Sequence, residues 1–232
     1  STTVPGTNIA SGSAIVIDTT VPTITSFTST TNNGSYKSAG TVNITATASE
    51  AVVATNTITA TLDTGRAVTL TAADNGTTLV GTYTVSASEN SNDLTVSSFS
   101  IGTVTDIAGN AMASTTVPGT NIASGSAIVI DTTAPTVSGV EITDGAGKQN
   151  NFLNVGDNVS VTVTFSENST VTGTPQLTLA VGEDNHTADY TSSGSGATTK
   201  VFKYTIRAED NDTNGISIRA DALALNGGTI MD

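Results

Sequence analysis

The stretch STTVPGTNIASGSAIVIDTTVPT, which runs from Ser1 to Thr23, occurs again as STTVPGTNIASGSAIVIDTTAPT from Ser114 to Thr136. The two copies differ only where Val21 is replaced by Ala134, and the second copy starts 113 residues (114 − 1) after the first. Near-identity at a fixed interval is typical of tandem repeats. An interval of this length gives each repeat enough chain to bury its own core.

The repeat interval divides the 232 residues into two domains. Because the second copy is expected to close the first domain, we place domain one at residues 18–130 and domain two at residues 131–232. Residues 1–17 are then the last strand of a preceding repeat or a donor strand for another chain. The chain contains no Cys, which excludes disulfides and thiolate metal sites.

Apolar and polar residues alternate in VNITATA at Val42–Ala48 and in VSVTVTF at Val159–Phe165. A period of two places the apolar residues on one face of a strand, and Thr, Val and Ile favour strands. Strands separated by turn residues every 8 to 12 residues or so predict an all-β fold of tandem Ig-like antiparallel β-sandwiches, with about seven strands each. The expected strands are at 23–28, 41–48, 55–62, 67–73, 79–87, 94–105 and 112–130, and at 136–143, 158–165, 175–181, 186–191, 199–208 and 215–230.

The last residues predict that the second sandwich lacks its final strand. GTVTD at Gly102–Asp106 matches GTIMD at Gly228–Asp232, so the sequence given is expected to end at the turn before that strand. An incomplete sandwich exposes backbone donors and apolar side chains. Two hypotheses follow: the chain is a slice of a longer array, or residues 1–17 of one copy complete domain two of a neighbouring copy and build a filament.

Composition argues against several classes of function. Seven basic residues against twenty acidic ones give a net charge of −13, which disfavours nucleic acid and anionic membranes as partners and favours cation binding. No apolar run reaches the roughly 18 residues of a membrane-spanning helix. A single His, at His186, and the lack of a nucleophile elbow predict that the chain is not an enzyme.

Each domain begins with a short linker that ends in Pro, namely DTTVP at Asp18–Pro22 and DTTAP at Asp131–Pro135. Pro fixes its own φ and pushes the preceding residue toward an extended conformation. We therefore expect a stiff joint rather than a flexible tether.

Acidic loops at both ends of a sandwich are candidate Ca²⁺ sites, because Ca²⁺ takes six to eight oxygen ligands. In an Ig-type sandwich, two loops gather where the chain enters and another lies where it leaves. The ligands expected where the chain enters are Asp18, Glu50, Asp106 and Asn110. Those expected where it leaves are Glu89, Asp93 and Asp131, with Asn90 and Asn92 in the same loop and with Glu167 of domain two facing them. The alternative is that these acids only stabilise the backbone of ordinary turns.

A third candidate is the loop DNDTNG at Asp210–Gly215. Its spacing matches the start of a D-x-D-x-N-G calcium loop, although no flanking helices are expected and the twelfth residue, Asp221, is not Glu. The expected ligands are Asp210, Asp212 and Asn214. The alternative is a polar turn in which the Gly supplies a positive φ.

Several short motifs mark the starts and turns of the two domains. They are IDTTAPT at Ile130–Thr136, Ser49-Glu50, Ser166-Glu167, TDIAGN at Thr105–Asn110, TGTPQLTL at Thr172–Leu179 and LNGGTI at Leu225–Ile230. Together they resemble the Ig-like repeats of giant, type I-secreted bacterial surface adhesins, over the whole chain. The resemblance implies an extracellular stalk at the bacterial cell surface, often stiffened by Ca²⁺ at the joints, with the ligand-binding head elsewhere. Domain two ends before the Ala-Gly-Asn signature.

These observations predict a non-catalytic spacer of an extracellular adhesin, whose partners are neighbouring repeats and whose adhesive target is unknown. A self-assembling filament is the first alternative. A carbohydrate- or ice-binding module is the second, but the chain has no Trp, only four Tyr and five Phe, and no short strict repeat behind its Thr residues.

Overall fold

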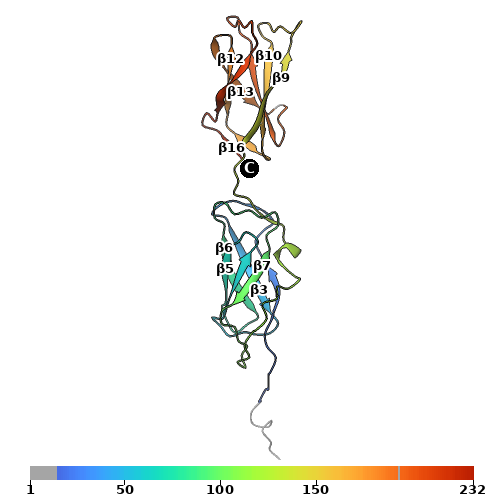
Figure 1. Ribbon diagram of the computed structural model, residues 1–232, viewed down its shortest axis with the longest axis vertical. Coiled ribbons are helices and arrows are strands. Elements are labelled where there is room, and N and C mark those ends of the chain that lie inside the picture. The colour runs from blue at the N-terminus through green and yellow to red at the C-terminus, as the bar shows by residue number, and fades with distance from the viewer. Residues whose placement is uncertain (1–14, 193) are drawn as a thin grey trace, which may run out of the picture. The chain divides into compact units, whose positions relative to one another are not determined.

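The computed structural model describes residues 15–192 and 194–232, so residues 1–14 of the expected donor strand lie outside the described part. The chain divides into two compact units between Thr133 and Ala134. Nearly all of the regular structure is β-strand (Figure 1), and the antiparallel sheets curl into half-barrels, which confirms the all-β sandwich-type fold. Within the described residues, no helix has the length and apolarity needed to cross a membrane.

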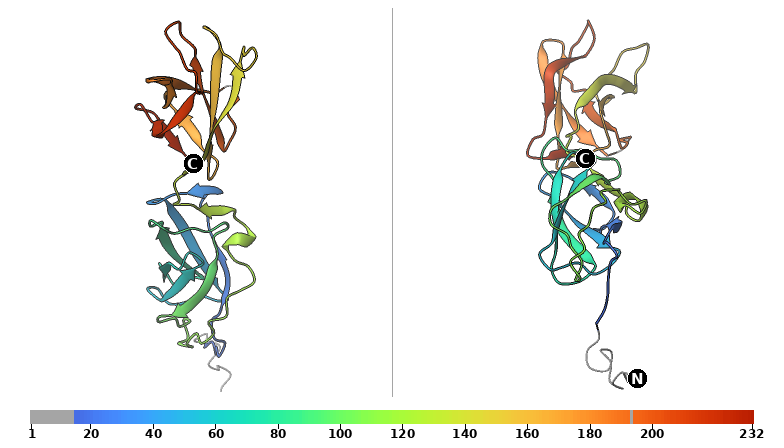
Figure 2. Two further views of the ribbon diagram at one scale, coloured as in Figure 1. Left: turned by 45° about the horizontal axis from the view of Figure 1, so that its top comes forward. Right: turned by 60° about the horizontal axis from the view of Figure 1, so that its bottom comes forward.

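The described residues of the first unit form eight strands and a short 3₁₀ helix. They are β1 (Ile24–Thr28), β2 (Gly34–Tyr36), β3 (Thr41–Ala48), β4 (Thr57–Leu62), β5 (Ala67–Ala72), β6 (Thr78–Thr84), β7 (Val96–Ile101), η2 (Ile122–Ser124) and β8 (Ile128–Ile130). Six of the strands form one antiparallel sheet in the order β1-β3-β6-β5-β4-β7, and β2 pairs with β8 in parallel (Figure 2). β1 and β7 are therefore the two end strands of the curled sheet.

The core of this unit follows from the alternation in the sequence. In β3, Val42, Ile44 and Ala46 are completely buried, and the residues between them are half-buried. The rings of Phe27 and Phe99 pack edge to face with centroids 5.6 Å apart. Because every second residue faces the core, a register slip of one residue would expose the whole apolar set.

The second copy of the repeat stretch closes the first unit. Its isoleucines are at most 1 % exposed, namely Ile122, Ile128 and Ile130. Backbone hydrogen bonds tie the segment to both ends of the sheet. Phe27 N in β1 donates to Thr120 O at 3.1 Å, and Leu94 N, just before β7, donates to the backbone oxygen of Ile128 at 2.8 Å.

The expectation of one continuous strand at 112–130 is wrong. Asn121 accepts a hydrogen bond from Ile122 N at 2.8 Å and caps η2, a position that Asn favours. The same side chain accepts from Val96 N at 3.0 Å and donates to Val96 O at 2.9 Å. Because one amide satisfies both the turn and the edge of β7, the segment bends instead of extending.

The second unit contains the strands β9 (Val137–Ala146), β10 (Asn158–Phe165), β11 (Thr170–Thr172), β12 (Gln176–Val181), β13 (Asp184–Thr191), β14 (Thr199–Thr205), β15 (Ser217–Ala224) and β16 (Thr229–Met231). Its main sheet has the order β15-β12-β13-β14-β10-β9. Read from β9, this order matches that of the first unit, so β9 corresponds to β1 and β15 to β7. The repeat in sequence is therefore also a repeat in topology.

Short strands are the main difference from the expected elements. The expected strand at 215–230 is split into β15 and β16 by a turn in which Asn226 and Gly227 have φ angles of 48° and 75°. β11 pairs with β16, and neither β11 nor β2 was expected. Three residues are too few to show an alternating pattern, because their pairing depends on distant partners.

Candidate metal centre

Three acidic side chains converge at the end of the first unit where the chain enters. Asp18 precedes β1, Glu50 follows β3, and Asp106 follows β7. One carboxylate oxygen from each residue lies within 4.8 Å of the other two. Two oxygens bound to one Ca²⁺ ion at 2.3–2.6 Å are at most about 5 Å apart, so the three carboxylates fit a single ion.

A tight turn holds Asp106 in place. Asn110 donates through its backbone N to Asp106 Oδ1 at 2.8 Å and through Nδ2 to Oδ2 at 2.7 Å. Gly109 N donates to Asp106 O at 3.2 Å, and the φ of Gly109 is 97°, which a side chain would resist. Asn110 was expected to be a ligand, but in the structure its amide nitrogen orients the carboxylate of Asp106.

Asp18 is held against the same turn and against the end of β3. Asn110 Nδ2 donates to Asp18 O at 3.1 Å, and Thr20 N donates to Asp18 Oδ1 at 3.0 Å. Further along, Thr23 N donates to Ser49 Oγ at 3.0 Å and Ser49 N donates to Thr23 O at 2.8 Å. The linker therefore runs beside the loop that carries Glu50, which explains how residues far apart in sequence meet.

The electrostatics of this cluster suit a cation. Burial raises the pKa of Glu50, and the negative charges of Asp18 and Asp106 raise it further. Burial also acts to raise the pKa of Asp106, but hydrogen bonds from Asn110, Gly109 and Ala108 outweigh it and lower the pKa overall. Asp106 therefore stays ionised. Of the three carboxylates, Glu50 is the one whose ionised form is least stable without a nearby positive charge.

One atom of the cluster has no protein partner. Glu50 Oε1 is buried and receives no hydrogen bond. A buried acceptor without a partner is unfavourable, and coordination to a cation would satisfy it. Carboxylate and carbonyl oxygens, with neither His nor Cys, are ligands for Ca²⁺ or Mg²⁺ rather than for Zn²⁺. The residues present therefore fit a hard divalent cation.

At the other end of the first unit, Glu89 stabilises the fold by accepting hydrogen bonds from three residues. Its Oε1 accepts from Arg66 Nε at 2.8 Å, and its Oε2 accepts from Tyr83 OH and from Ser86 N, both at 2.8 Å. Burial and the hydrogen bond to Glu89 raise the pKa of Tyr83 to about 12. Among the described residues, neither Glu89 nor Asp93 belongs to a group of three potential ligands.

Asn90, which was expected near Asp131, holds the exit of the first unit. Asn90 Oδ1 accepts from Thr132 N at 2.9 Å, and Asn90 Nδ2 donates to Thr133 Oγ1 at 3.3 Å. Asp131 forms the same local turn as Asp18, since Thr133 N donates to Asp131 Oδ1 at 3.0 Å. The amide of Asn90 thus fixes the segment by which the chain leaves the first unit.

In the second unit, Glu167 follows β10 as Glu50 follows β3. A carboxylate oxygen of Glu167 lies within 4.8 Å of one of Asp232. The pairing of β11 with β16 brings Asp232 to this place, as the bridge between Val52 and Asp106 does in the first unit. Asp232 was missed as a candidate ligand. The match between GTVTD and GTIMD could have identified it, because the last residue of GTVTD is Asp106 and the last residue of GTIMD is Asp232.

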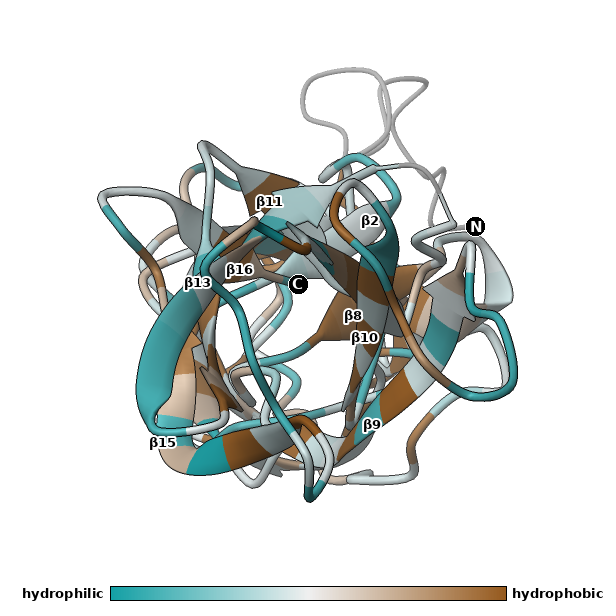
Figure 3. Cartoon of the chain, turned by 90° about the horizontal axis from the view of Figure 1, so that it is seen from above, coloured by the Kyte–Doolittle hydropathy of each residue, from teal (hydrophilic) through white to brown (hydrophobic). Residues whose placement is uncertain are grey.

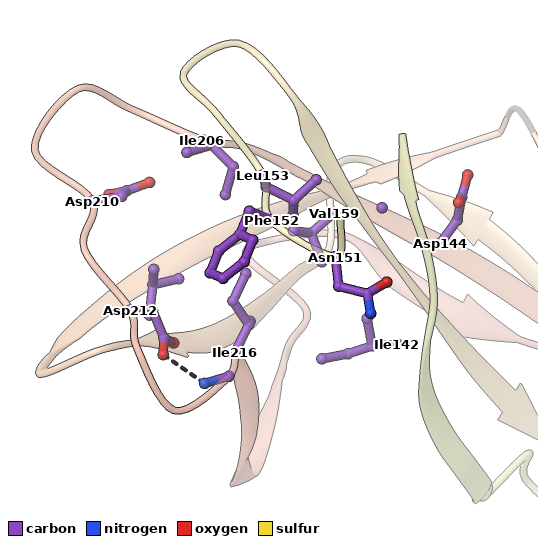
Figure 4. Close-up of a pocket in the computed structure, with 13 residues that line it drawn as sticks. Ile142, Asp144, Asn151, Phe152, Leu153, Val159, Ile206, Asp210, Asp212 and Ile216 are labelled. Carbon is purple, nitrogen blue, oxygen red and sulfur yellow. Dashed lines mark hydrogen bonds between the residues drawn. The ribbon is translucent and has the colours of Figure 1, made fainter. Parts of the chain in front are cut away.

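The DNDTNG loop directs its two carboxylates to different partners (Figure 4). Asp210 Oδ2 accepts from Tyr204 OH at 2.6 Å and from Arg207 N at 2.8 Å, and Asp210 Oδ1 lies 3.3 Å from His186 Nε2. Burial opposes ionisation of Asp210, but the hydrogen bonds from Arg207 and Tyr204 and the nearby His186 lower its pKa overall. Asp210 thus occupies the place that Glu89 holds in the first unit.

Asp212 caps the backbone of the same loop. Its Oδ2 accepts from Gly182 N at 2.9 Å, and its Oδ1 accepts from Asn214 N at 2.9 Å and Gly215 N at 2.7 Å. Chiefly through the bond from Gly182, these contacts lower its pKa. Among the described residues, neither Asp210 nor Asp212 joins a group of three potential ligands. This geometry favours the polar turn over a wrapped calcium ion.

No protein-family model matches the chain, and no curated protein matches it. The resemblance to adhesin repeats therefore depends on the sequence motifs alone, and function is argued from the geometry.

Proposed function

We propose that the chain is a non-catalytic structural spacer of an extracellular bacterial surface protein, in which Ca²⁺ binds to Asp18, Glu50 and Asp106. The observation that carries this proposal is the convergence of three carboxylates around Glu50 Oε1, a buried oxygen without a hydrogen-bond partner. Two units of the same topology, each with its own apolar core, support the role of a repeated structural module.

The ion would act as a clamp on the linker. Asp18 belongs to the segment that leads into the domain, whereas Glu50 and Asp106 belong to loops of the folded sheet. A cation bound to all three joins the linker to the domain and offsets the repulsion among the acids. The freedom of the linker to swing would fall, and a chain of such domains would bend less.

Direct binding tests the proposal. Calcium is titrated into the chelator-treated full chain in a calorimeter, alongside Glu50→Gln and the matched control Asp93→Asn. We expect binding by the wild-type chain and by the control, and a large loss of affinity in Glu50→Gln. Equal affinity in all three proteins would show that the cluster is not the calcium site. The absence of any heat of binding in all three would show that the chain does not bind calcium.

A further inference from the structure

Most of the linker that leads into the first unit lies on the surface. Residues 19–21 are exposed, and within Asp18–Pro22 only Pro22 is buried. The strand β8 is held in a different way: its residues are all apolar, as their brown colour in Figure 3 shows, and Ile128 and Ile130 are buried. Because Pro22 is the only buried residue of the linker, the position of Asp18 depends on hydrogen bonds rather than on apolar packing.

The side-chain amide of Asn110 holds Asp18 and Asp106 together. Asn110 Nδ2 donates to the backbone oxygen of Asp18 at 3.1 Å and to Asp106 Oδ2 at 2.7 Å. An amide nitrogen carries two protons, so these two bonds use all of its donor capacity. The first bond joins residues that are 92 positions apart in the sequence, and it attaches the linker directly to the turn after β7.

This attachment decides whether Asp18 can act as a ligand. Thr20 N donates to Asp18 Oδ1 at 3.0 Å, which fixes the carboxylate relative to the linker. The bond from Asn110 fixes the linker relative to the folded unit. Together they bring a carboxylate oxygen of Asp18 within 4.8 Å of those of Glu50 and Asp106. If the linker moved away, only the carboxylates of Glu50 and Asp106 would remain for an ion.

We propose that Asn110 couples calcium binding to the docking of the linker, as a positioning residue rather than as a ligand. The coupling rests on the proposed function, because it concerns the same calcium site. An ion bound to Asp18, Glu50 and Asp106 favours the docked linker, and the docked linker must raise the affinity for the ion by the same factor. Asn110 can transmit this effect because it contacts one ligand in the linker and one in the folded unit.

Asn110→Ala removes only the side-chain amide from this arrangement. Backbone bonds also hold the turn, and the change leaves them in place: Asn110 N donates to Asp106 Oδ1 at 2.8 Å, Asp106 N donates to Asn110 O at 3.1 Å, and Gly109 N donates to Asp106 O at 3.2 Å. The matched control is Asn92→Ala, at an exposed residue of the same type in the loop before β7. A difference between the two variants therefore reports on the side-chain amide of Asn110.

Calorimetric titration of calcium into the full chain tests the coupling. Loss of a group that orients a metal ligand costs about 10- to 100-fold in affinity, so we expect a loss of this size in Asn110→Ala and no change in Asn92→Ala. Asp18→Ala supplies a second background, because it removes the carboxylate but keeps the backbone oxygen. If Asn110 acts by placing Asp18, Asn110→Ala should cost much less affinity in that background than in the wild type.

Backbone relaxation measured by NMR on the calcium-free chain gives a readout that does not depend on the ion. The order parameters of the Thr20 and Val21 amides should fall in Asn110→Ala, from about 0.85, which is typical of rigid backbone, toward the flexible range below about 0.6. The amide of Ala46, which is buried in β3 between two neighbouring strands, should keep its order parameter and show that the unit is folded.

The possible outcomes distinguish the coupling from the proposed function. A wild-type chain that binds no calcium would refute the proposed function and the coupling with it. Calcium binding by the wild type, with equal affinity in Asn110→Ala, would overturn the coupling alone. An equal cost of Asn110→Ala with and without the Asp18 carboxylate would also overturn it, because Asn110 would then act only on Asp106. Unchanged order parameters in the linker would do the same.

Discussion

The cluster of Asp18, Glu50 and Asp106 predicts that Glu50→Gln changes stability in opposite directions with and without calcium. Gln keeps the shape of Glu but removes its charge. Without metal, Glu50 of the wild-type chain lies beside two other acids, and one of its buried oxygens has no hydrogen-bond partner. We therefore expect the variant to be at least as stable as the wild type in EDTA.

The sign follows from the raised pKa of Glu50. A carboxyl whose pKa is higher in the folded state favours folding while it is protonated, and this contribution disappears as the pH rises through the folded pKa. Above the folded pKa, the charge on Glu50 opposes folding in the absence of metal. Removing the charge removes that opposition.

With calcium the order reverses. A ligand present at a hundredfold excess over its Kd stabilises the folded state by about 2.7 kcal/mol. For a unit of this size a change of 1 kcal/mol moves the unfolding midpoint by about 4 °C, so calcium should raise the wild-type midpoint by about 10 °C. Glu50→Gln should lose most of this rise, because it removes one of three charged ligands.

The assay is thermal unfolding in CaCl₂ and in EDTA at matched ionic strength, with Asp93→Asn as the control. The control should keep the full calcium-dependent rise. A rise in Glu50→Gln equal to that of the wild type would refute the assignment of the ligands. A variant that is clearly less stable than the wild type in EDTA would refute the electrostatic argument.

Three further changes test other parts of the structure. Tyr204→Phe removes the hydroxyl that donates to buried Asp210 and should destabilise the second unit by about 1–3 kcal/mol in urea unfolding; an unchanged midpoint would contradict this role. Gly81→Ala would push a Cβ into a backbone oxygen of β5 and should cost about 1–3 kcal/mol of stability, whereas Gly119→Ala, in open space, should be nearly neutral. Lowering the pH through the raised pKa of Glu50 should weaken calcium binding measured by calorimetry, because protons compete for that ligand; a constant affinity down to pH 4 would exclude Glu50 as a ligand.

Regular strands were predictable because their pattern is local. The alternation at Val42–Ala48 and Val159–Phe165 identified β3 and β10 almost to the residue. The bend at Asn121 was not predictable, because it depends on hydrogen bonds to Val96, which is distant in the sequence. The short strand β2 also depends on a distant partner, and three residues cannot show a period.

The candidate site was likewise predictable only in part. Chain topology was enough to bring Asp18, Glu50 and Asp106 to one end of the first unit. It could not show that Glu89 is bound by Tyr83, because that contact depends on side-chain geometry. A signal was nevertheless present: Tyr and the acid six residues later occur in both units, as YTVSASE and YTIRAED.

The parallel pairing of β2 with β8 determines how the first unit would respond to tension. Gly34 pairs with Ile128 and Tyr36 pairs with Ile130, so the two strands start at the same end. When the first unit is stretched from its two ends, the tension enters through β1, which precedes β2; once β1 detaches, β2 is pulled from its start and β8 from its finish, in opposite directions along one axis. The hydrogen bonds between them are then loaded in shear and must break together rather than one after another. A unit of this kind would therefore resist stretching up to a threshold force and then unfold abruptly.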